Sequence, residues 1–294
     1  MIVFAIPLRA KETSSNWNMC VARLNQTIRS IFNQTCDEFK CLIACNEAPQ
    51  LDREYDERLE FIPLELSIPN GWLEMSRDKF WKLTVIAVRI RQLLEQQKNP
   101  DEGIYVMPVD ADDLLNCNIA EYCKEHPKEN GLVSDSGYVW QVGKRFLRKY
   151  PQMYEYCGSC NIIKMYRDDL PDKCPAPASL CHDKETAAVL NLRYPIRYDH
   201  NTVVRRYAEE EKPFSTLPFC STVYVLGTGD NISAIFHNEN SERDKRFHPI
   251  AFLRNINPFQ MQYISRKIKK EFCIEFQPGM PNPFQPPSSV GCRF

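Results

Sequence analysis

The segment Ile104–Leu115 constrains the fold of this chain more than any other. It opens with an apolar run rich in β-branched residues, which is typical of a buried strand, and continues directly into Asp110, Asp112 and Asp113. Carboxylates this close together repel one another, and their burial is costly unless a cation compensates. In an open α/β sheet, ligands bind outside the carboxyl ends of the strands. The segment therefore predicts a strand end that holds a divalent metal against phosphate groups.

A simpler interpretation of the same carboxylates is structural. One aspartate would cap a helix that begins at Leu114, and the others would be solvated. An isolated Asp-x-Asp pattern is more often of this kind. The buried strand before the carboxylates and the apolar pair Leu114-Leu115 after them favour the metal interpretation here.

The first half of the chain alternates strand and helix patterns. A helix is expected to start near Ser14 or Ser15, and a long helix is introduced by Ser76–Lys79 and ends at Pro100. This alternation predicts an α/β, Rossmann-like fold with a mostly parallel central sheet flanked by helices. The expected strands of this half are Ile2–Pro7, Phe39–Cys45, Leu59–Leu64 and the run that begins at Ile104.

The second half of the chain predicts a further helix through Ile119 and Tyr122, and then shorter strands. Among these strands are Tyr194–Tyr198 and Val223–Leu226. We expect one domain over residues 1–255, followed by a C-terminal helix and a proline-rich tail over 256–294.

Composition limits the possible partners and the compartment. The formal net charge of −1 predicts no nucleic-acid surface, and no apolar run is long enough to span a bilayer. The N-terminus lacks the features of a signal peptide, and the 13 cysteines have no disulfide-like spacing, so we expect a cytoplasmic protein with reduced thiols. The basic run Arg266–Lys270 is either a solvated helix face or a peripheral contact with an anionic membrane.

Several of these features, taken in order, resemble the GT-A glycosyltransferases of the family-2 type. The resemblance covers about residues 1–240 and depends most on the Asp110-Ala111-Asp112-Asp113 element. It implies a GT-A fold, a nucleotide-diphosphate sugar (most simply a UDP-sugar) as donor, a glycan or other hydroxyl acceptor, and Mn²⁺ or Mg²⁺ as cofactor. The weaker positions are a first strand ending in Pro7, a second ending in Asn46-Glu47, the turn Gly158-Ser159-Cys160-Asn161, Asp183 and His237.

The resemblance also implies roles for residues on the donor side. The metal would be held by Asp112, with Asp110 and the late His237, for which the alternative is a structural histidine. A cation before the long helix, Lys79 or Arg77, would meet a phosphate, although a solvated helix start is the alternative. The residues expected to bind the donor are Pro7, Leu8, Arg9, Glu47, Lys79, Asp110, Ala111 and Asp112.

On the acceptor side, Asp183 is the expected catalytic base of an inverting reaction. It stands at an expected helix start, where the helix dipole favours the ionised carboxylate, but it would serve equally as a simple cap. The residues expected to bind the acceptor are Gly158, Ser159, Asn161 and Trp140, and the alternative for Trp140 is a place in the core.

Two departures from the family pattern keep other functions open. The second strand ends in Asn46-Glu47 instead of paired aspartates, and His182-Asp183 stands where the family has Glu-Asp. The first alternative is therefore a catalytically silent GT-A-like domain that binds a nucleotide-sugar or a partner. A nucleotidyltransferase or phosphatase is less well supported. No Gly-rich, Lys-bearing phosphate loop lies near the N-terminus, and Leu114 follows the aspartates where a phosphatase has a hydroxyl residue.

Overall fold

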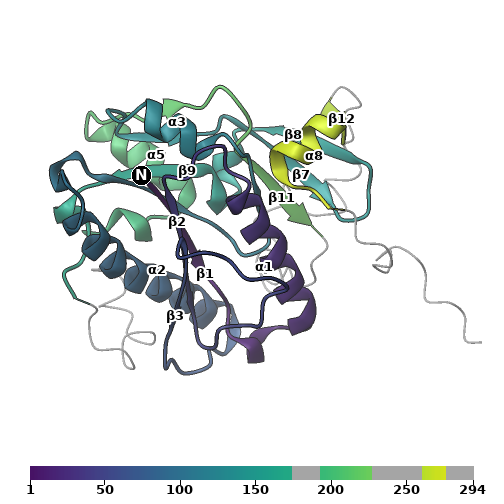
Figure 1. Ribbon diagram of the computed structural model, residues 1–294, viewed down its shortest axis with the longest axis horizontal. Helices are drawn as coiled ribbons and strands as arrows, with labels where there is room; N and C mark the ends of the chain where they lie inside the picture. The colour runs from purple at the N-terminus through teal and green to yellow at the C-terminus, as the bar shows by residue number, and fades with distance from the viewer. Residues whose placement is uncertain (174–192, 227–259, 276–294) are drawn as a thin grey trace, which may run out of the picture.

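A mostly parallel sheet of seven strands lies at the centre of the computed structural model, which describes residues 1–173, 193–226 and 260–275 (Figure 1). The strand order is β10-β6-β9-β4-β1-β2-β3, and β9 runs antiparallel to both of its neighbours, β4 and β6. The bounds are β1 (Ile2–Pro7), β2 (Phe39–Cys45), β3 (Leu59–Pro63), β4 (Ile104–Pro108), β6 (Gly131–Val133), β9 (Asn161–Met165) and β10 (Ser215–Thr216).

Successive side chains of a strand point to opposite faces of the sheet, and the central strands are apolar on both faces. Helices cover both of these faces. On β1, Phe4 packs into the apolar cluster that includes α1 (Trp17–Phe32), whereas Ala5 packs into the cluster that includes α2 (Gly71–Glu95). Figure 1 shows both helices beside the sheet. The protein is therefore a mixed α/β fold with a helix-flanked, mostly parallel sheet, as the sequence pattern predicted. The remaining described helices are α3 (Ile119–Glu125), α5 (His200–Glu209) and α8 (Arg266–Phe272).

The order of the parallel strands creates a switch point beside β1. The chain runs from β1 to β2 and β3 on one side, and then crosses to β4 on the other side of β1. In open α/β sheets the crevice at such a reversal, outside the carboxyl ends of the strands, is where ligands bind. Pro7 at the end of β1 and the carboxylates after β4 stand at this position.

A second sheet of five strands packs beside the first, in the order β12-β8-β7-β11-β5. Its one parallel pair is β7 with β11. Ile268 and Phe272 of α8 pack with Leu147 and Trp140 of this sheet, so the C-terminal helix is part of the folded core. The bounds are β5 (Leu114–Leu115), β7 (Ser136–Gln141), β8 (Phe146–Pro151), β11 (Thr222–Leu226) and β12 (Met261–Tyr263).

Four local predictions differ from the structure. The long helix, α2, begins at Gly71, so Arg77 and Lys79 lie within it and not before it. The cap of α1 is Asn16, whose Oδ1 accepts the Met19 N–H at 3.1 Å, instead of Ser14 or Ser15. The predicted strand at Tyr194–Tyr198 is wrong, because Pro195, with its fixed φ, opens a 3-10 helix there (η6, Pro195–Arg197). No helix begins at Leu114, which lies in β5.

None of the helices in the described ranges combines the length and the apolar character needed to cross a membrane.

Candidate functional site

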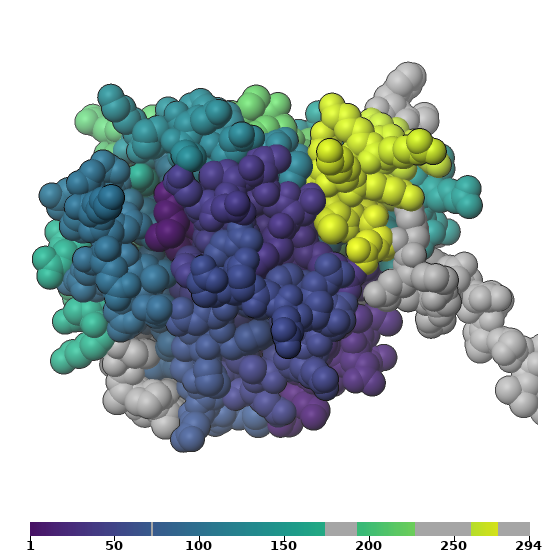
Figure 2. Space-filling model, in the orientation of Figure 1, coloured from purple at the N-terminus to yellow at the C-terminus, as the bar shows by residue number. Residues whose placement is uncertain are grey.

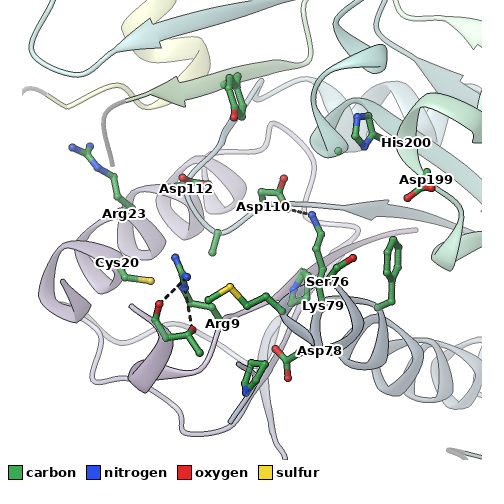
Figure 3. A pocket seen from close by; sticks show the side chains of 18 of the residues that line it. Arg9, Cys20, Arg23, Ser76, Asp78, Lys79, Asp110, Asp112, Asp199 and His200 are labelled. Carbon is green, nitrogen blue, oxygen red and sulfur yellow. Dashed lines mark hydrogen bonds and ion pairs between the residues drawn. The ribbon is translucent and has the colours of Figure 1, made fainter. Parts of the chain in front are cut away.

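A cavity of about 350 Å³ opens at the switch point, outside the carboxyl ends of β1 and β4 (Figure 3). The beginnings of α1, α2 and α5 also reach it, together with Tyr224 of β11. Its wall combines apolar surface with side chains of both charge signs. The charged side chains are Arg9, Arg23, Lys79, Asp78, Asp110, Asp112 and Asp199.

The closest charge pair in the wall joins Lys79 of α2 to Asp110 after β4. The Lys79 Nζ lies 2.5 Å from the Asp110 Oδ1, and about a third of each side chain remains exposed (32% and 33%). Burial opposes ionisation of both groups, but the Lys79 ammonium lowers the pKa of Asp110. In turn, Asp110 raises the pKa of Lys79 against the effect of burial. Asp110 is therefore held as a carboxylate with a protein cation already beside it.

Asp113 has a different environment from the other two aspartates, because it is fully buried behind the cavity. Its Oδ2 accepts the Ser159 hydroxyl at 2.6 Å and lies 3.2 Å from the Cys157 Sγ. Burial, helped by the neighbouring Cys157 and Asp112, raises the pKa of Asp113 well above its usual range. The Ser159 Oγ in turn accepts the Asp110 backbone N–H at 2.9 Å, so Asp113 fixes the strand end from behind.

Asp112 is presented by a short turn on the α1 side of the cavity. The turn is closed by the Asp113 N–H donating to the Asp110 carbonyl at 3.1 Å, and the Ala111 carbonyl accepts the Thr27 hydroxyl of α1 at 3.0 Å. Arg23 of α1 lines the cavity on the same side, and its Nη1 donates to the Gln26 Oε1 at 2.7 Å (Figure 3). Burial lowers the pKa of Arg23, and the charge of Asp112 works against that shift.

His200, the first residue of α5, approaches the Lys79–Asp110 pair from the other side of the cavity (Figure 3). Burial lowers the pKa of His200, and the Lys79 ammonium lowers it further against the effect of Asp110. One ring nitrogen, Nε2, lies 3.2 Å from the Glu155 carbonyl oxygen. The lowered pKa favours the uncharged imidazole.

The sequence interpretation did not identify Arg23, Asp78, Asp199 or His200 as site residues. For Asp199-His200, an acidic residue directly before a helix was a usable signal, but the incorrect strand assignment at Tyr194–Tyr198 concealed the helix start. Arg23 lies within α1, where the apolar face was the only pattern that the sequence showed. No local sequence feature therefore indicated Arg23 as a site residue.

The structure brings together most of the residues expected to bind the donor. Leu8 is an exception, because its side chain is buried in the core cluster with α1. Glu47, after β2, is exposed and does not line the cavity. The expected residues that do line it are Pro7, Arg9, Lys79, Asp110, Ala111 and Asp112.

The residues expected to bind the acceptor are divided between the cavity and the core. Gly158 lines the cavity, and a Cβ there would lie 3.5 Å from the Asp110 Oδ2. Asn161 lines an adjoining cavity of about 60 Å³, and its Nδ2 donates to the His200 carbonyl at 2.9 Å. Ser159 is buried behind Asp110. The role given to Trp140 is wrong, because its ring is 1% exposed and its Nε1 donates to the Lys144 carbonyl in the core of the second sheet.

Two of the expected residues, Asp183 and His237, lie outside the described residues, so their roles stay predictions. Within the described ranges, no group of three His, Cys, Asp or Glu side chains is arranged to hold a metal. Asp112 and Asp110 nevertheless fit Mg²⁺ or Mn²⁺, since Mg²⁺ is usually bound by one or two carboxylates together with substrate phosphates.

Comparison with known proteins assigns no family. No protein-family model matches the chain, and no curated protein matches its sequence. The assignment of a function therefore depends on the geometry of the site.

That geometry suits a ligand with concentrated negative charge beside a polar, uncharged part. Arg9, Arg23 and Lys79 supply donors for anionic oxygens, and guanidinium groups bind phosphates through two parallel hydrogen bonds. The cavity volume of about 350 Å³ is at the lower end of the range for small-molecule sites. Phe80, Tyr156 and Tyr224 add ring surfaces to the wall.

Proposed function

We propose that the protein is a metal-dependent glycosyltransferase of the GT-A type. In this proposal it moves a sugar from a nucleotide-diphosphate donor, most simply a UDP-sugar, to the hydroxyl of a glycan or other acceptor. The observation that carries the proposal is the position of Asp110 and Asp112. They follow a central parallel strand, and they share one switch-point cavity with three cations, Arg9, Arg23 and Lys79.

The chemistry of transfer explains why the cavity holds both signs of charge. As the bond to the anomeric carbon breaks, negative charge grows on the diphosphate leaving group. A divalent metal held by Asp112 with Asp110 neutralises part of that charge when it is bound. Arg9, Arg23 and Lys79 stabilise the rest, because fixed cations stabilise charge that develops in the transition state.

The acceptor hydroxyl must lose a proton in an inverting reaction. Asp183 stays the predicted base, with its expected helix dipole favouring the ionised form. Among the described residues, His200 is a second group that could take this proton, because its imidazole is neutral and faces the cavity.

One alternative is favoured by a specific observation. Lys79 already compensates Asp110, and a protein cation in that place is also compatible with a catalytically silent domain that binds a nucleotide-sugar without metal. The two functions differ in whether bound donor is consumed. Slow hydrolysis of the donor in the presence of Mn²⁺ supports the enzyme, whereas binding without any turnover supports the silent domain.

The direct test is donor turnover by Asp112→Asn. The proposal predicts that wild-type protein with Mn²⁺ releases nucleoside diphosphate from a UDP-sugar, and that a chelator stops this release. Asp112→Asn should lower the rate of release by at least about a hundredfold, as expected when a transition-state contact is lost. Asp101→Asn makes the same exchange at an exposed position outside the cavity and should leave turnover unchanged. Turnover that resists both the chelator and Asp112→Asn would contradict the metal role.

A further inference from the structure

An exposed pair of aromatic rings marks the outer end of the second sheet. Phe146 begins β8 and Tyr263 ends β12, and the two residues are paired across the antiparallel strands. Their rings stand edge to face at 5.6 Å, yet the two residues are 47% and 53% exposed. Met261, two residues before Tyr263 on β12, is 37% exposed. Large apolar side chains gathered at a surface in this way indicate an interaction site.

Exposed basic residues flank this pair along the chain. Lys144 and Arg145 form the turn that leads into β8, and the Arg145 carbonyl accepts the Ile264 N–H at 3.0 Å. That hydrogen bond fixes the turn beside the start of α8, where Arg266 and Lys267 are exposed. We call the six residues together the basic–aromatic rim: Lys144, Arg145, Phe146, Tyr263, Arg266 and Lys267.

The two segments that carry the basic–aromatic rim are strongly basic, unlike the chain as a whole. Residues 136–151 and 260–275 contain eight Lys and Arg but only two carboxylates, in a protein whose formal net charge is −1. Both carboxylates already lie near cations: Glu271 is 3.7 Å from Lys267, and Glu275 pairs with Arg29 of α1. In Figure 2 the helix that carries four of these cations covers one corner of the molecule.

From this arrangement we propose that the basic–aromatic rim docks the protein on an anionic lipid bilayer. Exposed Phe and Tyr rings enter the boundary between headgroups and acyl chains, while Lys and Arg meet anionic headgroups. A nucleic acid is a poorer fit, because one basic corner on a net acidic chain lacks the extended basic surface that such ligands need.

Docking through the rim would bring the cavity close to the membrane. Tyr224 of β11 lines the cavity, and β11 is separated from β12 by β7 and β8. Three strand spacings of ~4.8 Å place the cavity wall about 15 Å from the rim. The inference does not depend on the proposed enzyme activity, since docking is measured without any donor.

The test is sedimentation of the full chain with large vesicles at low salt. Vesicles of phosphatidylcholine containing about one third phosphatidylserine should carry the protein into the pellet, and vesicles of phosphatidylcholine alone should not. Lys144→Glu combined with Arg145→Glu should weaken partitioning by at least about tenfold, because each basic residue near the surface contributes roughly a factor of five. Phe146→Ala combined with Tyr263→Ala should also weaken it, and added salt should reduce it further.

Matched controls use exposed residues on the first sheet's side of the molecule. Lys98→Glu with Lys128→Glu repeats the charge reversal, and Tyr166→Ala removes a ring that is 45% exposed. Neither control should change partitioning, and circular dichroism checks that every variant is folded. Equal sedimentation of wild type with neutral and anionic vesicles would overturn the proposal. So would rim variants that match the controls, or binding to heparin with no binding to vesicles, which would identify a soluble polyanion as the partner.

Discussion

At the scale of single residues, the proposed metal site predicts that Lys79 and a divalent metal compete for one carboxylate, that of Asp110. The Lys79 ammonium is 2.5 Å from Asp110 and holds that group ionised. We predict that Lys79→Met raises the affinity for Mn²⁺ by roughly tenfold, because removing a fixed cation from a half-exposed site is worth about 1–2 kcal/mol. Calorimetric titration with Mn²⁺ measures the change, and Lys98→Met is the exposed control. Unchanged affinity would show that Asp110 does not take part in holding the metal.

Asp113 should make stability depend on pH. Its folded-state pKa is raised by burial, whereas an unfolded aspartate titrates near ~3.9. The folded state therefore binds the proton more tightly, and the contribution of Asp113 to stability falls as pH rises above about 4. Asp113→Asn cannot titrate, so its stability relative to wild type should improve between about pH 5 and pH 8, by at most about 1.4 kcal/mol per pH unit.

Urea denaturation at both pH values measures this difference. Asp101→Asn, at an exposed position, shows how much of the change any exchange of aspartate for asparagine produces. If the difference in the free energy of unfolding between Asp113→Asn and wild type is the same at about pH 5 and pH 8, Asp113 is ionised in the folded protein.

Single residues also show where the sequence was informative. The pattern singled out Asp110 and Asp112, which line the cavity, because a strand followed by carboxylates is a local signal. It gave no reason to separate Asp113, whose burial depends on Ser159, distant in sequence. The core position of Trp140 likewise depends on α8, which packs against it from the end of the chain.

At the scale of elements, the entry into β4 depends on a backbone turn that requires glycine. Gly103 has a φ of +69°, and an added Cβ would lie 2.8 Å from the Met165 carbonyl oxygen of β9. Gly143 has a φ of +83° with no atom within 4 Å of its Cβ position. We predict that Gly103→Ala lowers the free energy of unfolding by at least about 1 kcal/mol more than Gly143→Ala, since both share the cost of a positive φ. Equal losses in chemical denaturation would show that β4 and β9 separate readily.

Element periodicity explains why the strands around β1 were predictable, whereas in the second sheet Val223–Leu226 of β11 was predicted but β5 and β12 were not. The strands around β1 are continuous apolar runs joined by helices with clear apolar faces, and each can be recognised alone. In the second sheet, β5 has two residues and β12 has three, and the latter joins β8 from more than a hundred positions away. Pairing of such short, distant strands leaves no local pattern.

At the scale of the whole molecule, the candidate site exists because both sheets meet at the switch point. Asp110 follows β4 of the first sheet, Tyr224 belongs to the second sheet, and His200 reaches the same cavity from α5. The sequence predicted one edge of this cavity, but it could not show that the chain around residue 200 returns to that edge. The charge balance of the cavity, and so its ligand class, is a property of this convergence.

The central claim is that Asp112 and Asp110 bind a nucleotide-diphosphate sugar together with a divalent metal, and a thermal-unfolding matrix tests it most directly. A ligand at about a hundred times its Kd stabilises the folded protein by about 2.7 kcal/mol, which should raise the Tm by roughly 5 °C. We predict this rise for wild type with Mn²⁺ and one member of a panel of UDP-, GDP-, CMP- and dTDP-sugars, and its loss in Asp112→Asn but not in Asp101→Asn. If no donor in the panel raises the Tm with Mn²⁺, or if Asp112→Asn responds as wild type does, the claim is contradicted.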